Sequence, residues 1–372
     1  TTGTDRTISF DLVARARVFG GFDGTEVALA QRDPVAHPTI LSGEIGLAGA
    51  IDNSQHVVRA DESFIDRDSI LDGFIITAGN MSSVAGTGGG VFITNGAKPT
   101  IANCRIVGNN AFAAGGGVRV EGNASPLIMN CAILGNTARN AAGLDVVNAA
   151  ATVINPLIAH NASSLVSPGG VRWTNATGTL ANGVIVGNTS NGLVGQAAQI
   201  TVASSTLNIT HNDIEDLDGS IGDATNFDED PAFLNLPGTD GVVGTVDDDL
   251  RLTDCSPLIE KGSIVALPLD LADLDEDFDT TERYSIDITN GARIINDPSH
   301  AGVSVDVGPL EHPGSPLPDP DLNDDGIVGP PDLAILLSAW DTDGCHPADL
   351  NGDGTVGPAD LALLLAAWTV NP

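Results

Sequence analysis

The chain has 372 residues, of which 49 are acidic and 15 basic, so its formal net charge is −34. Residues 1–212 hold 14 acidic and 11 basic side chains, whereas residues 213–372 hold 35 and 4. So few Lys and Arg side chains argue against nucleic acid or an anionic membrane as a partner, because phosphate contacts need cations on the protein. The carboxylates of the C-terminal part favour divalent cations instead, which bind to oxygen ligands.

No run of 18 apolar residues occurs, so we expect no transmembrane segment. The chain opens at Thr1 without a basic and apolar leader, which predicts a secreted form whose signal peptide has been removed. We therefore expect the protein outside the cell or at the cell surface. The four cysteines form no short-spaced zinc pattern; they are Cys104, Cys131, Cys255 and Cys345.

Residues 1–72 predict short strands separated by turns. Apolar pieces at residues 18–19, 40–41 and 70–71 each end in Gly, Ser or Asp. Such short runs bounded by turn residues are typical of strands.

A repeated segment follows these strands. Residues 88–91 read Gly-Gly-Gly-Val and lead to Gly108-Asn109, and residues 115–118 read the same and lead to Gly135-Asn136. The offset is 27 residues at both ends, and a fixed period in the twenties indicates a solenoid. Because no stretch of ten residues shows a period of 3.6, we expect an all-β fold, a right-handed parallel β-helix. Its domain is predicted to span residues 1–312, with regular rungs over about 73–212.

Asparagine recurs at the bends of the predicted rungs. Asn tolerates a left-handed backbone, and stacked amides can hydrogen-bond along the axis. We therefore expect two ladders of structural Asn side chains, with the thiols of Cys104 and Cys131 stacked and buried at one repeat position. The predicted ladders are Asn80, Asn109, Asn136, Asn161, Asn188 and Asn212, and, six residues earlier, Asn103, Asn130, Asn155 and Asn182.

Acidic residues are nearly absent from the regular rungs, where only Glu121 and Asp145 occur. Arg119, Asp145 and Arg172 follow the same repeat position, so we expect them to stack as a row on adjacent rungs. A hydrolase needs two carboxylates beside the scissile bond, and a lyase needs a base. We interpret the row as a charge ladder, and we predict no catalytic residue and no organic cofactor.

Residues 213–300 are acidic and turn-rich, and we interpret them as insertions between the last rungs. The apolar pieces at 250–252, 258–259 and 303–305 are predicted to be those rungs. Carboxylates clustered in two loops are candidate ligands of further structural calcium ions. These residues are Asp240, Asp247 and Asp249 in the first loop, and Asp273, Asp275 and Asp277 in the second.

A Pro-rich linker at residues 313–320 precedes two copies of one twelve-residue loop, at 321–332 and 349–360. Oxygen-bearing residues at positions 1, 3, 5 and 12, with a backbone carbonyl at 7, match an EF-hand calcium loop. We therefore predict two Ca²⁺ sites. The expected ligands are Asp321, Asn323, Asp325, Ile327 and Asp332 in the first loop, and Asp349, Asn351, Asp353, Thr355 and Asp360 in the second.

An amphipathic helix is predicted after each loop. The apolar residues recur at helical spacing, which predicts that the two helices pack on each other; an exposed docking face is the alternative. The two stripes are Leu333, Leu336, Leu337 and Trp340, and Leu361, Leu364, Leu365 and Trp368.

Asp rather than Glu stands at loop position 12, and no helix enters either loop. In these features residues 321–369 resemble a type I dockerin, which implies a calcium-folded module that docks onto a cohesin-like partner. Residues 17–136 resemble secreted bacterial right-handed β-helix proteins in the Phe-Gly-Gly-Phe-Asp-Gly-Thr-Glu run at 19–26, Leu-Asp-Gly-Phe at 71–74 and the Gly-rich rungs. The combination is similar to extracellular proteins of planctomycete-like bacteria.

The leading hypothesis is a non-enzymatic structural or scaffold protein of the cell surface or extracellular matrix. Its C-terminal module, residues 321–372, would dock or self-assemble in the presence of calcium. The partner would be a cohesin-like or other surface protein, or further copies of the chain. Two alternatives stay open: a dockerin-borne enzyme that binds or cleaves polysaccharide, and a subunit of a self-assembling extracellular fibre.

Overall fold

The structure is a computed structural model, and its description covers most of the chain. Of the predicted ligands, Asp275, Asp277 and Asp353 lie outside the described residues, as does Cys345. The described residues are 5–46, 49, 51–270, 273–274, 279–295, 304–313, 319–323, 325–342, 346–351 and 355–369.

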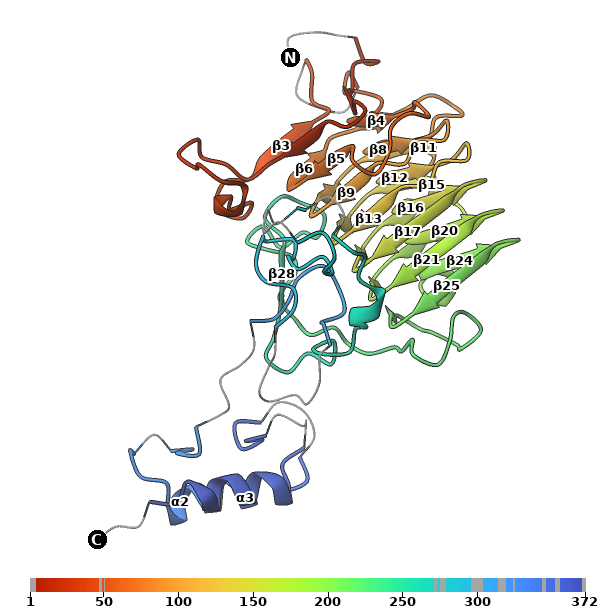
Figure 1. Cartoon of the computed structure of the whole chain (residues 1–372). Helices are drawn as coiled ribbons and strands as arrows, with labels where there is room; N and C mark the ends of the chain where they lie inside the picture. The colour runs from red at the N-terminus through yellow and green to blue at the C-terminus, as the bar shows by residue number, and fades with distance from the viewer. Residues whose placement is uncertain are drawn as a thin grey trace.

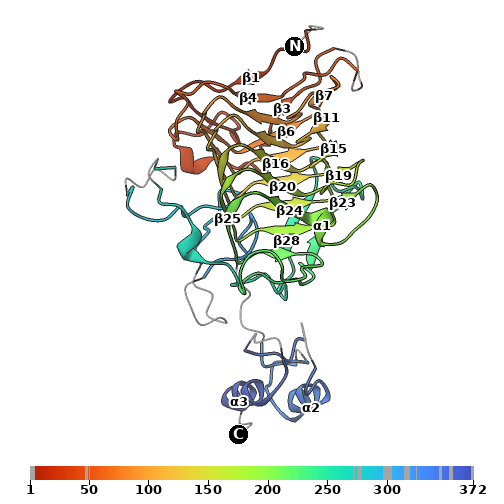
Figure 2. The same ribbon diagram turned by 90° about the vertical axis from the view of Figure 1, so that its right-hand side faces the viewer.

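Four parallel sheets form a coil of stacked rungs (Figures 1 and 2). Sheet A is seven-stranded and consists of β1 (Phe10–Asp11), β4 (Val58–Ala60), β8 (Val91–Ile93), β12 (Val118–Val120), β16 (Leu144–Val147), β20 (Val171–Thr174) and β24 (Ile200–Ala203). Sheet B is also seven-stranded and consists of β2 (Arg17–Phe19), β5 (Ile70–Asp72), β9 (Thr100–Ala102), β13 (Leu127–Met129), β17 (Ala150–Ile154), β21 (Thr177–Ala181) and β25 (Thr206–Thr210).

The other two sheets complete each rung. Sheet C has seven strands: β3 (Thr39–Ser42), β6 (Phe74–Thr77), β10 (Arg105–Val107), β14 (Ala132–Leu134), β18 (Leu157–Ala159), β22 (Val184–Val186) and β26 (Asp213–Ile214). Sheet D has five: β7 (Asn80–Met81), β11 (Asn110–Ala114), β15 (Thr137–Asn140), β19 (Ala162–Ser163) and β23 (Thr189–Ser190). Short helices lie at η1 (Leu29–Gln31), α1 (Gln196–Gln199) and η2 (Ile264–Ala266).

The 27-residue offset sets the register of the rungs, as the sequence predicts. Val118 pairs with Val91, and Arg105 with Ala132, so equivalent residues stack along the coil. Inward-facing apolar residues of sheets A, B and C form one continuous core, with Trp173 fully buried in it. The coil therefore buries its interior by stacking rungs, each of which is too small to hold a core alone.

The Asn side chains form two hydrogen-bonded ladders at the bends. One ladder, here called the second because its residues follow those of the other within each rung, consists of Asn109, Asn136, Asn161 and Asn188. Its members are joined by bonds of 3.0–3.1 Å between Nδ2 and the next Oδ1. The other ladder, here called the first, consists of Asn103, Asn130, Asn155 and Asn182. Each of its amides donates to the Asn of the preceding rung, over 2.7–3.1 Å. The members of the first ladder have φ near +50°, which Asn tolerates better than most residues.

Both ends of the second ladder differ from the prediction. Asn80 pairs with Asn110, because Gly79 stands at the ladder position and donates its N–H to Asn109. At the other end Gln199 follows Asn188, and its Oε1 accepts the Asn188 amide at 2.8 Å. Asn212 instead lies just before β26, at a different bend.

Residues 233–313 are here called the wrap, and the residues of it that the structure describes do not continue the parallel rungs. The piece predicted as a rung at 250–252 lies in β28 (Asp249–Leu252), which pairs antiparallel with β27 (Phe233–Asn235). The wrap lies beside the coil instead (Figure 1), and its buried apolar residues, among those described, pack against the outside of sheets B and C. The outward-facing residues of these two sheets are themselves apolar, so the wrap stabilises the fold by removing their surface from water. Examples are Ile75, Leu157 and Val184 on sheet C, and Met129 and Ile154 on sheet B.

The first Asn ladder also fastens the wrap. Asn103 donates to the Tyr284 hydroxyl at 2.6 Å, Asn130 donates to the Ile286 carbonyl at 2.8 Å, and Asn182 donates to the Ser263 carbonyl at 3.1 Å. Buried amides that would lack a partner on the coil are thereby satisfied by the wrap.

The C-terminal module contains α2 (Pro330–Ser338) and α3 (Pro358–Ala366), which pack on each other. Its core includes Leu336, Leu364, Val328 and Val356. Each helix begins with Pro at its first position, after a Gly N-cap, where the missing N–H costs nothing.

Cys104 and Cys131 are free and buried in the coil, as predicted, and Cys255 is disulfide-bonded. Among the described residues, no helix has the length and apolar character needed to cross a membrane.

Candidate functional sites

The predicted charge row is present on the outer face of sheet A. Arg119, Asp145 and Arg172 are paired in register on β12, β16 and β20. Arg172 holds Asp145 through two bonds of 2.8 Å, and Arg119 binds the same carboxylate while its Nε donates to Glu121 at 2.8 Å. The Asp145 side chain is fully buried between the two guanidinium groups. Both acidic residues of the regular rungs are therefore paired with arginine.

On the two preceding rungs of sheet A, the positions in register with Arg119 are occupied by Phe92 and Arg59. The His56 ring stacks on Phe92 with centroids 4.7 Å apart, and its Nδ1 lies 2.5 Å from the Gly88 carbonyl oxygen. Burial lowers the pKa of His56. His56 thus packs as an uncharged ring on the face of the sheet.

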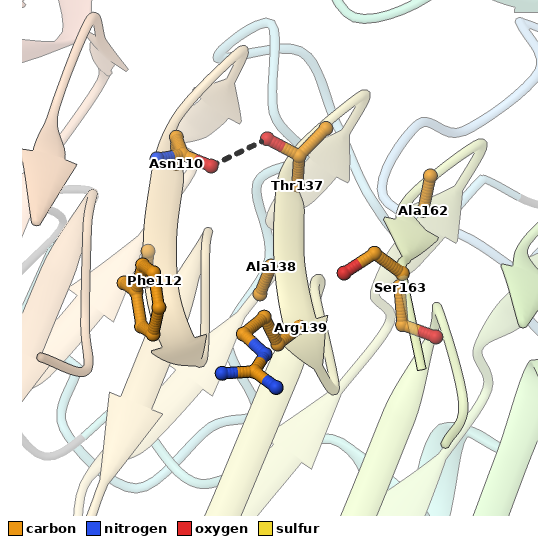
Figure 3. A pocket seen from close by; sticks show the side chains of 9 residues that line it. Asn110, Phe112, Thr137, Ala138, Arg139, Ala162 and Ser163 are labelled. Atoms are coloured by element: carbon orange, nitrogen blue, oxygen red, sulfur yellow. Dashed lines mark hydrogen bonds between the residues drawn. The ribbon is translucent and has the colours of Figure 1, made fainter. Parts of the chain in front are cut away.

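Sheet D carries a shallow hollow of about 350 Å³ on its outer face (Figure 3). Arg139 lies over the Phe112 ring at 5.1 Å, and the Thr137 hydroxyl donates to Asn110 at 3.0 Å. The polar groups that line it are thus partly engaged with each other.

The acidic loop at residues 240–249 folds across the corner between sheets C and D. Gly244 lies so close to Gly135 that a Cβ there would come within 2.5 Å of the Gly244 Cα. The Asp247 carboxylate accepts bonds from the hydroxyls of Thr239 and Thr245, which hold its pKa well below its usual range.

The carboxylates of Asp240 and Asp249, also predicted as ligands, have different partners. Asp240 accepts the Val242 N–H at 2.7 Å, and Asp249 forms a two-bond pair with Arg251. Asp273 lies in a turn at φ +50°, with its N–H on the Asp270 carbonyl. Within the part of the chain that the structure describes, no three His, Cys, Asp or Glu side chains come together as a metal site.

The first twelve-residue loop is closed by its own carboxylates. The Asp321 oxygens accept the N–H groups of Asp325 and Gly326 at 3.1 and 2.6 Å. Asp332 accepts the N–H groups of Asn323 and Gly329 at 3.2 and 2.8 Å, which brings loop position 12 beside position 3. The donor set is entirely oxygen, as a Ca²⁺ ion requires.

The second loop repeats this arrangement in its described residues. Asp360 accepts the N–H groups of Asn351 and Gly357 at 3.1 and 2.7 Å. The predicted ligands Asp349 and Thr355 both precede Asp360 in the chain, and Asp349 is largely buried.

The two halves of the module hold each other reciprocally. The Val328 carbonyl accepts the Thr369 N–H at 3.0 Å, and the Val356 carbonyl accepts the Asp341 N–H at 2.9 Å. Asp341 and Thr369 differ by the same 28 residues as Val328 and Val356, so each helix end binds the loop of the other half.

His160 and His211 occupy bend positions of the coil, with φ of +53° and +55°.

A cleft that was not predicted opens between sheet C and the wrap. Its volume is about 840 Å³, and its walls include Arg105 of β10 and Asp248 of the acidic loop. Burial raises the pKa of Asp248 to about 6, and burial raises that of Glu311, at the other side of the cleft, to about 8. The only sequence signal was Arg105 itself, a charged residue in a row that is otherwise apolar on most rungs.

The comparisons with known proteins agree with this fold. Residues 64–226 match the family model described as right handed beta helix region. Together with the stacked parallel sheets, the match identifies a right-handed β-helix repeat protein. No curated protein and no solved structure matches the chain.

Proposed function

We propose that this protein is a non-enzymatic, secreted scaffold whose β-helix is attached to its surroundings through a calcium-binding C-terminal module. The reciprocal exchange between Val328–Thr369 and Val356–Asp341 carries this proposal. It supports a module made of two equal halves, each of which presents one oxygen-lined loop.

Calcium would be held by Asp321, Asn323, Asp325, Asp332 and the Ile327 carbonyl, and by the equivalent residues of the second loop. The ion would neutralise carboxylates that otherwise repel one another, so its binding adds to folding stability. Because Asp332 and Asp360 already cap α2 and α3, calcium would connect each loop to the helix that follows it.

A docking surface is available on the module. Leu337 and Leu365, related by the 28-residue offset, are 51% and 52% exposed. These two residues of the apolar stripes lie outside the core of the module, whereas Leu336 and Leu364 are buried in it. We propose that this pair contacts a cohesin-like or other surface protein, or a second copy of the chain.

The experiment is a calorimetric calcium titration of the full chain. The wild type should bind about two ions in the module, and the double variant Asp321→Ala/Asp349→Ala should lose both. Asp68→Ala, which removes an exposed carboxylate outside the module, is the control and should bind like the wild type. Unchanged binding by the double variant would overturn the calcium assignment.

Docking is tested with Leu337→Asp/Leu365→Asp. In the presence of calcium this variant should lose association with a cohesin-like domain, or self-association in sedimentation, whichever the wild type displays. Val265→Asp, an exposed apolar residue of the wrap (72% exposed), is the control. A wild type that stays monomeric with calcium and binds no such domain would contradict the docking proposal.

The non-enzymatic part of the proposal is supported by the charge row, whose two carboxylates are both held by arginines. We expect neither new reducing ends nor unsaturated products from pectin, alginate or neutral glycans. Release of either product at a catalytic rate would establish the polysaccharide-cleaving alternative.

A further inference from the structure

The cleft between sheet C and the wrap has the size of a small-molecule site. Its volume of about 840 Å³ lies within the range of ligand clefts in proteins. Part of its wall is apolar and is contributed by Pro34, Val35 and Pro38 of the N-terminal part and by Ile288 and Leu310 of the wrap. It lies on the coil and the wrap, away from the C-terminal module, so a ligand here is independent of the docking function.

Arg105 stands in this wall with most of its donors unused. It occupies the outer row of sheet C, in register with Ile75 and Ala132. Its Nη2 donates to the Asp248 carbonyl, but its buried Nε has no hydrogen-bond partner. None of the ion pairs of the described residues includes this guanidinium group. A buried donor left without a partner is costly, so a ligand or water that accepts its bond would be favoured.

Asp248 supplies an unused acceptor beside it. The residue is 4% exposed; its Oδ2 accepts the Gly244 N–H at 2.8 Å, while its buried Oδ1 has no partner. A donor and an acceptor that are both unpaired, on two contacting residues, fit a group that can accept and donate together. Hydroxyl groups do this.

The charged residues of the wall limit the net charge that a ligand can carry. Arg251 is already paired with Asp249, so Arg105 is the one arginine of the wall without a carboxylate partner among the described ion pairs. The wall holds the carboxyl groups of Asp247, Asp248, Asp249, Asp287 and Glu311. Because burial raises the pKa of Glu311 to about 8, polyanionic ligands would be repelled mainly by the aspartates, and a cationic ligand would have to approach the Arg105 guanidinium group.

We infer that this cleft binds a neutral oligosaccharide, with one sugar hydroxyl accepting from Arg105 and donating to Asp248. The apolar residues of the wall contact the carbon faces of the sugar rings.

The test is calorimetric titration of the full chain with short cello-, xylo-, manno- and malto-oligosaccharides, and with oligogalacturonate and oligoalginate as acidic probes. At least one neutral series should bind, and the acidic probes should not. Arg105→Met and Asp248→Asn should each weaken binding about tenfold or more, because each removes or alters a bond to a charged group. Arg139→Met, on the sheet D hollow, is the matched control and should change binding less than about twofold.

A substitution at the exposed rim of the cleft provides a second test in case Arg105→Met or Asp248→Asn disturbs folding. Val35 is 68% exposed and lines the cleft, so Val35→Asp should weaken sugar binding while leaving the thermal unfolding midpoint unchanged. Asp321→Ala/Asp349→Ala should bind sugar like the wild type, which separates this inference from the calcium proposal. The inference is overturned if no neutral oligosaccharide binds, if only acidic probes bind, or if Arg105→Met, Asp248→Asn and Val35→Asp all bind normally.

Discussion

The regular rungs and the wrap cover each other but follow different physical rules. In the rungs each contact is repeated at an offset near 27 residues, and polar groups inside are satisfied by neighbours of the same kind, as in the Asn ladders. Among the described residues of the wrap, buried carboxylates are held by unlike partners: Asp306 accepts the N–H groups of Glu260 and His312, and Glu311 accepts the Asp306 N–H and pairs with Arg293. A repeat thus distributes stability over many equal interfaces, whereas the wrap concentrates it in a few places.

The strongest way to break the rungs is to interrupt a ladder. Asn136 is fully buried and makes four bonds of 2.9–3.1 Å, to Asn109, Ile106 and Asn161. Asn136→Ala leaves these groups unpaired, and we expect a loss of about 3–5 kcal/mol in the free energy of unfolding. The measurement is urea unfolding followed by circular dichroism. The exposed bend residue Asn123 is the control: Asn123→Ala should cost only about 1–2 kcal/mol, from holding Ala at φ +61°, and equal losses would contradict the ladder's role.

The charge row on sheet A comes next. Asp145→Ala leaves the Arg119 and Arg172 guanidinium groups facing each other without a carboxylate, and we expect a loss of about 2–3 kcal/mol. This is less than for a fully buried pair, because Arg172 is 25% exposed. Asp61→Ala, which breaks the more exposed pair with Arg59 on the same face, should cost under about 1 kcal/mol. Equal costs in thermal unfolding would show that burial of Asp145 is unimportant.

The dependence of the unfolding midpoint on pH tests the buried carboxyl group of Asp213 at the end of the coil. Burial raises the pKa of Asp213, the last sheet C carboxylate, to about 7. The unfolded chain ionises this group near pH 4, so its contribution is fully present below that pH and is lost as the pH rises toward 7. The unfolding midpoint of the wild type should therefore fall between pH 4 and 7 more steeply than that of Asp213→Asn. Asp218→Asn, at an exposed carboxylate, should leave the wild-type slope in place; identical slopes for all three would contradict the assignment.

The smallest effect is expected on sheet D. Arg139 and Phe112 form a surface cation–π pair, which is worth about 0.5–1 kcal/mol at exposed sites. A double-mutant cycle with Arg139→Ala and Phe112→Ala should give a coupling energy in that range. A larger coupling would mean that the hollow carries more of the fold than its exposure suggests.

The sequence predicted the rungs well because their contacts are local to the repeat. The offset from Gly88 to Gly115 determined the register, and the Asn spacing located the bends. Asn80 and Asn212 were assigned to the wrong ladder positions, because Gly79 and Gln199 take those places without resembling Asn in a sequence pattern.

The wrap could not be predicted in the same way. Pieces such as Leu250–Leu252 have the same apolar character as a rung strand, so the sequence does not say whether they enter the coil or cover it. The apolar outer rows of sheets B and C were the missing signal: Ile75 and Leu157 alternate with buried neighbours, so both faces of sheet C are apolar. The cleft was missed for the same reason, because Arg105 and Asp248 meet only when the wrap is in place.

The claim that calcium acts on the C-terminal module and not on the rungs is tested most directly by hydrogen exchange with mass spectrometry, with calcium and with chelator. Amides of residues 321–369 should exchange much more slowly with calcium, because its binding stabilises only the state in which the loops are closed. Amides of residues 73–212 should exchange at the same rate in both conditions. No change in the module, or a change confined to the rungs, would contradict the account.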